Sequence, residues 1–423
     1  MSPTEALSVW LYESRVADIE RARNGRLSLR FTEEALDRFG PDSPILSTSM
    51  PTRMEPYPNA PTRDFFEGLL PEATARTSVV RALNAHRPRG SELDGGDTFG
   101  LLRELGRDCA GALVIQPPSE DAPAAAPISE AMPISDDEVA ERLARLPQAP
   151  LGVDGRTGVR VSLAGVQRKL LLARRADGRW VDPANGIPST HILKPQIPDM
   201  NLPRSVENEA FCMRLAARVG LPAARVEVAE FGGLRVLVVE RFDRRVVDGR
   251  IQRIHQEDSC QALGIRPSLK YEEQGGPQLR RLAAVLAGFG REDDLGQLLQ
   301  LAAFNVAIGN ADAHGKNYSF LHHRSGYVAL SPAYDVMSTT LYEAVDRTMG
   351  MFIDDVRSID DVELDRIVNE GASWGMTRAD AETAVVHALL AIRDALADTE
   401  DLSVEPDLRD LVRSRTARLT ESL

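Results

Sequence analysis

The segment from Asn310 to Asn317, which reads Asn-Ala-Asp-Ala-His-Gly-Lys-Asn, concentrates side chains that suit phosphoryl transfer. That chemistry needs an acceptor-only group beside the attacking hydroxyl and oxygen ligands for a Mg²⁺ ion that bridges nucleotide phosphates. Asp312 and Asn317 can supply both from one short loop, and Asp335, after a short predicted hairpin, can complete the metal site. The alternative is that Asp312 and Asn317 merely cap turns, which is their commonest role. The preceding helix, the following Asp and a β-rich region upstream favour a kinase.

Two upstream segments contain groups that could bind phosphate. Lys194, in Thr-His-Ile-Leu-Lys-Pro, lies in a predicted strand, where its ammonium is a point charge suited to phosphate oxygens. A solvated lysine at a strand end is the ordinary alternative. Glu209, on the next predicted helix, could orient Lys194 by ion pairing, although a helix-surface Glu is the usual explanation.

The second segment runs from Ser162 to Lys169, between two predicted strands. The backbone N–H groups of such a small-residue turn can cradle phosphate oxygens. The segment contains neither GxGxxG nor GxxxxGKS, so it has no dinucleotide fingerprint and no Walker loop. Composition alone predicts a hairpin loop here.

A β-rich region followed by a helical one must position these residues. From about residue 158 to 243 short apolar segments alternate with turns, and the clearest hairpin turns at Gly232-Gly233. One helix is predicted at about 206 to 219. After Ser259 the apolar spacing is helical. This order, β-rich lobe and then helical lobe, is that of a two-lobed kinase.

The first hundred residues predict an α+β subdomain. Strand-like alternation at 7–11 and 27–31, with Asn24-Gly25 between, indicates a tight hairpin, and helical spacing begins at Arg63. Residues 116–134 hold five prolines and no basic residue, which is typical of a linker or exposed loop, and Ser135 with Glu138 then forms a capping box. The predicted domains are an N-terminal subdomain at 1–115, a Pro/Ala-rich linker or loop at 116–134, a kinase N-lobe at 135–243 and a helical C-lobe at 244–423.

Composition excludes several classes of protein. The 423 residues are 43% apolar and 27% charged, as in ordinary globular proteins and unlike collagen-like, fibrous or disordered chains. A net charge of -13 does not suit wrapping bare DNA or lying on an anionic membrane. No apolar run approaches the ~18 residues of a membrane-spanning helix, and no secretory signal is visible, so a cytoplasmic protein is expected. The three cysteines, Cys109, Cys212 and Cys260, predict packed thiols rather than disulfides or a zinc site. The adjacent His322 and His323 do not predict a metal site.

The ordered motifs of the chain resemble the HipA family of toxin kinases, the serine/threonine kinases of bacterial toxin–antitoxin modules. The resemblance covers nearly the whole chain, through LSTSMP, FFEGLLPE, VSLAGVQRKLLL, THILKP, NEAFCMRLA, VVERFDR, RIHQEDSCQALG, NADAHGKNYS and SPAYDVMS. It implies an α+β, two-lobed, protein-kinase-like fold. In that fold a β-rich N-terminal lobe carries an added N-terminal α+β subdomain, and the C-terminal lobe is all-helical.

The resemblance also implies roles for individual residues. Asp312 looks like the catalytic aspartate, Asn317 and Asp335 like the Mg²⁺ ligands, and Ser162 like a serine whose autophosphorylation ejects the phosphate loop. Residues implied to bind ATP are the phosphate loop Ala164, Gly165, Val166, Gln167, Arg168 and Lys169, the phosphate lysine Lys194, the adenine hinge Glu240, Arg241 and Phe242, and Gln256, His314, Gly315, Lys316 and Tyr334. Arg168 departs from the family pattern, in which Glu is frequent.

The function implied by the resemblance is that of an ATP- and Mg²⁺-dependent serine/threonine kinase. Its expected target is a translation component, an aminoacyl-tRNA synthetase such as that for glutamate. A helix-turn-helix antitoxin is the expected partner, through which alone the protein reaches operator DNA. Two alternatives stay open: a small-molecule or lipid kinase, because DxHxxN followed by Asp also resembles the phosphoinositide kinases, and a non-catalytic co-repressor of the antitoxin.

Overall fold

The computed structural model describes residues 5–153, 160–165, 167–291, 293–324, 326–397 and 406–421, which form two compact units. Unit 1 comprises residues 1–195 and 229–257, and unit 2 comprises residues 196–228 and 258–423. No helix among the described residues is long and apolar enough to cross a membrane.

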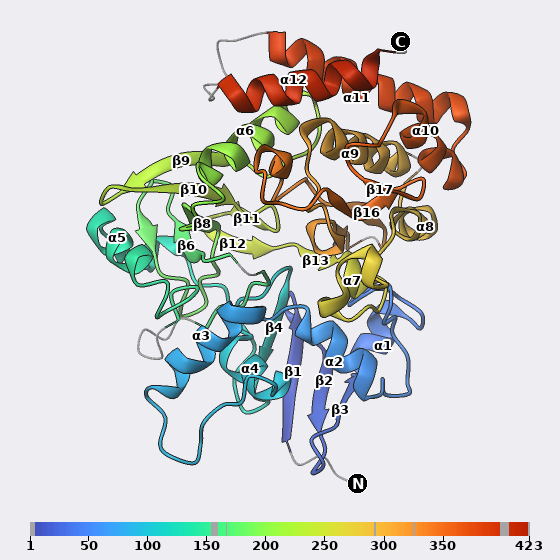
Figure 1. The fold of residues 1–423 in the computed structure, drawn as a ribbon. Helices are drawn as coiled ribbons and strands as arrows, with labels where there is room; N and C mark the ends of the chain where they lie inside the picture. The colour runs from blue at the N-terminus through green and yellow to red at the C-terminus, as the bar shows by residue number, and fades with distance from the viewer. Residues whose placement is uncertain are drawn as a thin grey trace. The chain divides into compact units, whose positions relative to one another are not determined.

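Unit 1 begins with an antiparallel sheet of order β3-β2-β1-β4 (Figure 1). Its strands are β1 Glu5–Leu11, β2 Ser14–Arg21, β3 Leu27–Phe31 and β4 Leu113–Gln116. The predicted alternation in β1 is confirmed, because Leu7, Val9 and Leu11 are all buried. The turn containing Asn24-Gly25 joins β2 to β3 rather than joining the runs at 7–11 and 27–31, so one strand was missing from the prediction. Strand β2 was hidden because it reads Ser-Arg-Val-Ala-Asp-Ile-Glu-Arg, in which charged residues interrupt the apolar pattern.

Four helices complete this N-terminal subdomain, defined here as residues 5–116. They are α1 Glu33–Phe39, α2 Asn59–Glu67, α3 Ala73–Asn84 and α4 Thr98–Leu105. Thr32 caps α1, because its side chain accepts a hydrogen bond from the backbone N–H of Ala35. The aromatic side chains Phe65, Phe66 and Phe99 are buried in one core with the apolar face of the sheet.

A second sheet has the order β5-β7-β6-β8-β10-β9. These strands are β5 Pro133–Ile134, β6 Leu170–Arg174, β7 Trp180–Val181, β8 His191–Pro195 and β10 Leu234–Glu240, and β9 Val226–Phe231 leads into β10 through the predicted Gly232-Gly233 turn. Helix α5, Asp136–Ala144, begins with the predicted Ser135–Glu138 capping box and packs Val139 and Leu143 on this sheet. A hairpin of β11 Arg244–Val247 and β12 Arg250–Arg253 follows, and then β13 His255–Asp258, which ends at the start of unit 2.

The Pro/Ala-rich segment 116–134 is a packed loop. Besides β5 it contains a 3₁₀ turn at Ile128–Glu130, and Ile128 is buried. The backbone N–H of Ala126 donates to Gly186 O at 3.2 Å, and that of Ile128 donates to Gly249 O at 3.0 Å. These bonds fix the segment on unit 1 despite its proline content.

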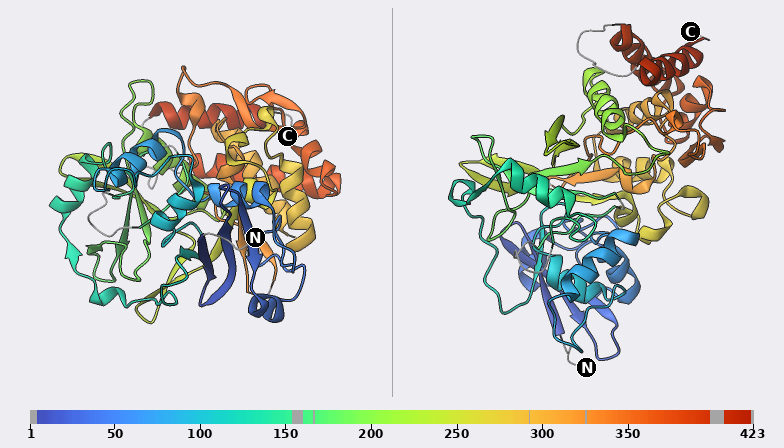
Figure 2. Two further views of the ribbon diagram at one scale, coloured as in Figure 1. Left: turned by 90° about the horizontal axis from the view of Figure 1, so that it is seen from below. Right: turned by 60° about the vertical axis from the view of Figure 1, so that its left-hand side comes forward.

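Unit 2 is built around α9, Asp294–Ile308, which is buried along most of its length and packs against α8, α10, α11 and α12 (Figure 2). Besides the predicted helices, unit 2 contains the hairpins β14–β15 and β16–β17, so it is not all-helical. Their strands have only three to six residues, too few for a periodic signal in the sequence. The further elements of the unit are α6 Ser205–Arg218, α7 Ser259–Ala262, α8 Leu279–Phe289, β14 Ser319–His322, β15 Val328–Leu330, β16 Thr348–Ile353, β17 Val356–Ser358, α10 Leu364–Ser373, α11 Arg378–Ala397 and α12 Pro406–Thr420.

Candidate active site

The loop that carries Asp312 is anchored at its start by buried hydrogen bonds. Gly309 ends α9 with a φ of 74°, and a Cβ at this position would collide with Thr340. The side chain of Asn310 donates to Asn305 Oδ1 at 2.8 Å, and the backbone N–H of Ala311 donates to Thr339 Oγ1 at 2.8 Å. The loop therefore leaves the helix in a fixed direction and brings Asp312 to the surface.

Asp312 is exposed and its carboxylate already has one polar partner. Oδ1 accepts a hydrogen bond of 2.8 Å from the phenol of Tyr271. Desolvation by the surrounding protein raises the pKa of Asp312, while the bond from Tyr271 and the charge of Lys270 lower it and the charge of Asp335 raises it. The geometry suits an acceptor group that takes a further hydrogen bond from solvent or from a substrate hydroxyl.

Asp335 and Asn317 provide the oxygens that the sequence assigned to a metal. Asp335 is exposed and adopts the left-handed conformation with φ of 57°, which an Asp tolerates at a cost in strain. Asn317 donates its amide Nδ2 to the backbone oxygen of Asp312 at 3.1 Å, so its Oδ1 is the atom that the predicted ligand role would use. Among the described residues no three His, Cys, Asp or Glu side chains form a metal cluster. One carboxylate and one amide oxygen, from Asp335 and Asn317, are too few for a cation bound by protein groups alone. They suit Mg²⁺, which commonly binds one or two carboxylates and completes its coordination with phosphates and water.

Lys316 is buried and its ammonium pairs with Asp258, which also caps α7. The hydroxyl of Tyr334 donates to the backbone oxygen of Lys316 at 2.7 Å and lies 2.6 Å from Ser319 Oγ. The side chains of Lys316 and Tyr334 thus hold the loop in shape. Their predicted contact with a nucleotide stays a prediction.

His314 and Gly315 pack against the segment 267–277. The imidazole of His314 meets the ring of Tyr271 edge to face at 5.2 Å, and burial lowers the pKa of His314 to about 3, so the ring is neutral. The backbone N–H of Gly315 donates to Lys270 O at 3.0 Å, and a Cβ on Gly315 would collide with Pro277. Glycine is needed at 315 for this close approach.

Tyr271 is a site residue that sequence reasoning missed. It stands in Ser-Leu-Lys-Tyr-Glu-Glu, where a single aromatic residue among polar ones was the only available signal. Glu272 anchors the segment, because its carboxylate accepts a hydrogen bond of 2.7 Å from the backbone N–H of Phe352 on β16. Tyr271 is therefore presented to Asp312 from a fixed backbone.

Ser162 in unit 1 is fully buried. Its Oγ donates to the carbonyl of Leu69 at 2.6 Å, and its backbone N–H donates to the carbonyl of Asp108 at 3.0 Å. A strand was predicted before this serine, but the described residues there contribute a single bridge between Asp108 and Val161. The serine is held by the N-terminal subdomain on both its side chain and its backbone.

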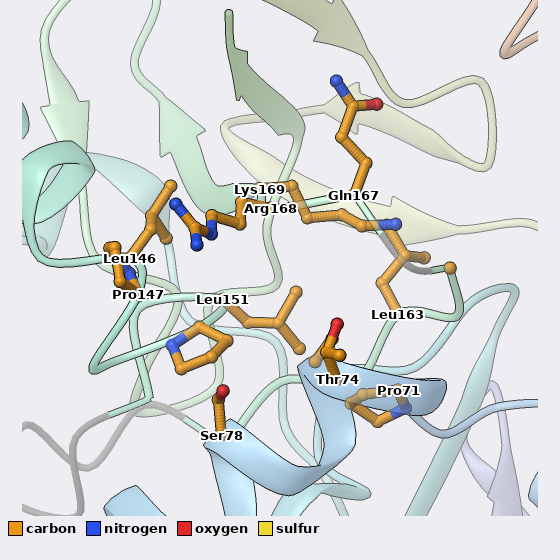
Figure 3. Close-up of a pocket in the computed structure, with 13 residues that line it drawn as sticks. Pro71, Thr74, Ser78, Leu146, Pro147, Leu151, Leu163, Gln167, Arg168 and Lys169 are labelled. Carbon is orange, nitrogen blue, oxygen red and sulfur yellow. The ribbon is translucent and has the colours of Figure 1, made fainter. Parts of the chain in front are cut away.

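The predicted phosphate loop, of which residues 164, 165 and 167–169 are described, follows Ser162 (Figure 3). The buried Lys169 ammonium donates to the carbonyl of Ala164, and Gly165 has a φ of 114°, which favours glycine. Arg168 is exposed and points toward Leu146 and Pro147, and it lines a pocket of about 110 Å³ between the loop, residues 146–151 and α3. Gln167 and Arg168 are directed to different sides of the loop, as Figure 3 shows. Val166 lies outside the described residues.

Lys194 is buried in the middle of the second sheet, on β8, opposite Leu237 of β10. A solvated lysine at a strand end, the ordinary alternative, is thereby excluded. Glu209 is equally buried on α6 of unit 2, so it is not an ordinary helix-surface glutamate.

The predicted hinge begins where β10 ends. Glu240 is exposed and Phe242 is half-buried, whereas the side chain of Arg241 is buried and binds Asp243 at 2.7 and 2.9 Å. Gln256, predicted beside ATP, donates to the same Asp243 carboxylate at 3.1 Å. The side chain of Arg241 is therefore committed to contacts with the protein.

The fold and the site together define a two-lobed, kinase-like enzyme, and comparisons with known proteins agree. The sequence model of the HipA-like C-terminal domain matches residues 161–396, and that of the HipA N-terminal domain matches residues 7–116. The chain belongs to the HipA family of kinases. The predicted family, fold class and enzyme class are confirmed.

Individual relatives extend the likeness over the whole chain. Y4mE of Sinorhizobium fredii, whose name marks it as a candidate kinase, is 38% identical over 413 residues, 94% of each chain. The serine/threonine-protein kinase toxin HipA of Shewanella oneidensis is 37% identical over 307 residues, 69% of this chain and 66% of that protein. A solved complex of HipA, HipB and operator DNA from the same organism contains a chain with a TM-score of 0.80, 28% identity and 97% coverage of both chains.

Proposed function

We propose that this protein is an ATP- and Mg²⁺-dependent serine/threonine kinase that acts as the toxin of a toxin–antitoxin pair. The observation that carries the proposal is the contrast within one loop of unit 2. Asp312 is exposed with an oxygen available to a substrate, whereas Asn310, His314 and Lys316 are buried in contacts that shape the loop. A loop with a purely structural role would not require an exposed carboxylate beside these buried contacts.

In this proposal each residue has one chemical task. The hydroxyl oxygen of a substrate Ser or Thr attacks the γ-phosphorus of ATP, the bond from that phosphorus to the ADP oxygen breaks, and Asp312 takes the hydroxyl proton. Asn317 and Asp335 hold the Mg²⁺ ion, which neutralises charge on the phosphates. Unit 1 supplies the hinge, Lys194 and the phosphate loop.

The proposed substrate is an aminoacyl-tRNA synthetase, such as that for glutamate, and the proposed partner is a helix-turn-helix antitoxin. The support is the family membership and the Shewanella relative, which was solved with HipB and operator DNA. The net charge of -13 supports contact with DNA through the partner rather than directly. A cytoplasmic location follows from these partners.

The test is transfer of labelled phosphate from ATP to purified synthetases and to a bacterial lysate, with Asp312→Asn as the inactive control. Labelling of one synthetase by the wild-type protein and not by the control supports the proposal. Labelling of a lipid or metabolite in place of a protein would contradict it. Absence of any phosphoryl transfer, with the antitoxin still bound, would leave the co-repressor role.

Autophosphorylation at Ser162 is the proposed off-switch. A phosphate there adds roughly -1.5 to -2 charges at pH 7, and the hydroxyl now donates to Leu69 O in a fully buried place. The phosphorylated serine cannot keep that bond or that environment, so the phosphate loop must leave. Phosphopeptide mass spectrometry after incubation with Mg²⁺-ATP tests this, and an unmodified Ser162 in an active enzyme would contradict it.

A further inference from the structure

A buried cluster of charges joins the N-terminal subdomain to the hinge within unit 1. The side chains of Asp108, Arg241, Asp243 and Arg244 are each at most 5% exposed. Arg244 donates to Asp108 Oδ1 at 2.8 Å, and Arg241 donates to Asp243 Oδ2 at 2.7 Å. The four side chains form four ion pairs, two of them with Asp108 of the N-terminal subdomain, and Arg241 belongs to the segment predicted to bind adenine.

Ser189 and the backbone of residues 108–111 complete the cluster. Asp108 Oδ2 accepts from the backbone N–H of Ser189 at 2.8 Å and from its Oγ at 2.6 Å, and that Oγ accepts from Arg241 at 2.8 Å. The backbone N–H of Gly111 donates to Asp243 at 2.7 Å, and the backbone oxygens of Cys109 and Gly111 accept from Arg244 at 2.7 and 2.8 Å. The hinge is thus clamped by hydrogen bonds made to residues before β4.

Asp108 also supports the phosphate loop. Its backbone oxygen accepts from the N–H of Ser162 at 3.0 Å, and its backbone N–H donates to Arg160 O at 3.2 Å. One residue of the N-terminal subdomain consequently touches the bases of both nucleotide-facing segments of unit 1.

Gly111 is held close to β13. It has a φ of 73°, and a Cβ there would lie 2.7 Å from the backbone nitrogen of Gln256 and 2.8 Å from its oxygen. A substitution at 111 must therefore push the 108–111 segment away from β13 or strain it.

We propose that the segment Asp108–Gly111 is a positioning element for nucleotide binding, which fixes the hinge Glu240–Phe242. The inference rests on the proposed function, because it takes the hinge as the segment that binds adenine. It gives the N-terminal subdomain a part in nucleotide recognition that its sequence alone does not suggest. Charge–charge contacts in a dry interior suit this task because they fix direction as well as distance.

The test is equilibrium binding of ATP and of GTP, measured by calorimetry on the full chain. Adenine presents an amino donor where guanine presents a carbonyl acceptor, so a displaced hinge loses adenine preference before it loses phosphate binding. Gly111→Ala is expected to weaken ATP binding on the order of 10-fold, and Ser189→Ala roughly 3-fold, with GTP affinity nearly unchanged. Ser189→Ala removes one hydroxyl and decides the matter if Gly111→Ala does not fold.

Thr32→Ala is the matched control. It removes a hydroxyl that caps α1 in the same subdomain, far in sequence from the hinge, so it is expected to lower the melting temperature and leave the ATP-to-GTP affinity ratio unchanged. Equal loss of ATP and GTP affinity in Ser189→Ala, or unchanged ATP affinity in both variants, would overturn the inference. Failure of the wild-type chain to bind ATP would instead overturn the proposed function.

Discussion

Two groups of acidic residues in this protein have opposite surroundings. Asp108 and Asp243 in unit 1 are buried, and although burial alone would raise their pKa values, the guanidinium groups of Arg241 and Arg244 lower both. Asp312 in unit 2 is exposed at its carboxylate, and its pKa is raised, by desolvation and then by the charge of Asp335. The carboxylates of the first group are paired with arginines inside unit 1. The second group, Asp312 with Asp335, is exposed and is the one proposed to serve a substrate hydroxyl and a cation.

The comparison distinguishes a structural class of charged residues, which stabilise the fold, from a chemical class, which is available to a substrate or a cation. A paired, buried carboxylate stabilises one conformation, whereas a carboxylate held near another of like charge is poised to accept a proton or a metal ion. Lys316 shows that one loop can contain both kinds of group, because it lies four residues after Asp312 and yet its ammonium is buried and paired with Asp258.

The sharpest way to break the comparison is Asp312→Asn. We expect phosphoryl transfer to fall by about 10²–10⁴-fold, because the amide cannot accept the hydroxyl proton. The melting temperature and ATP affinity should stay near those of the wild-type protein. Turnover near the wild-type rate would place Asp312 in the structural class.

The corresponding substitution in the buried group is Asp243→Asn. It leaves Arg241 without its closest carboxylate in a buried place, so we expect a loss of about 3–5 kcal/mol in the free energy of unfolding. Denaturant titration at neutral pH measures it. A loss below about 1 kcal/mol would mean that the cluster is not a source of stability.

The lowered pKa values of Asp108 and Asp243 also predict how the stability of the wild-type protein changes in acid. Because the folded-state pKa values of Asp108 and Asp243 lie below their unfolded values, the stability they confer is present above about pH 4 and is lost as the pH falls through the folded values. Asp243→Asn should therefore flatten the fall in unfolding free energy below pH 4. Identical pH profiles for the two proteins would contradict this account.

Asp335→Asn tests the second acidic group as a cation site. Loss of a carboxylate ligand should weaken Mg²⁺-ATP binding by at least about 10–100-fold. That range is typical of residues that only hydrogen-bond to a metal ligand, and losing the ligand itself should cost no less. Binding of ATP in the presence of EDTA should change little, which makes it the internal control. Unchanged Mg²⁺-ATP affinity in calorimetry would remove Asp335 from the metal site.

The sequence marks residues suited to the proposed chemistry more clearly than it marks buried support. Asp312, Asn317 and Asp335 stand out in the sequence because phosphoryl transfer calls for their residue types at this spacing, and their roles stay predictions. The Asp108–Arg244 pair joins positions more than a hundred residues apart, and no periodic pattern marks such a contact. The short strands β14 to β17 escaped for a related reason, since tertiary packing rather than local alternation determines them. The second strand β2 was obscured by its charged outer face.

The smallest expected effect belongs to Tyr271→Phe. This change removes the hydrogen bond from the phenol to Asp312 and keeps the ring against His314. A hydrogen bond to a charged group contributes about 1.5–3 kcal/mol, and part of it should be recovered from water at this exposed site, so we expect kcat to fall by roughly 3–10-fold. The KM for ATP should stay constant, because the change keeps the ring contact with His314, which is assigned to the nucleotide, and removes only the hydrogen bond to Asp312, which is assigned to the hydroxyl. Tyr327→Phe, which removes a phenol hydroxyl beside the β14–β15 hairpin of the same unit, is the control and should leave both constants unchanged. An equal rise in the KM for ATP would mean that Tyr271 shapes the loop as a whole, and would move it from the chemical class to the structural one.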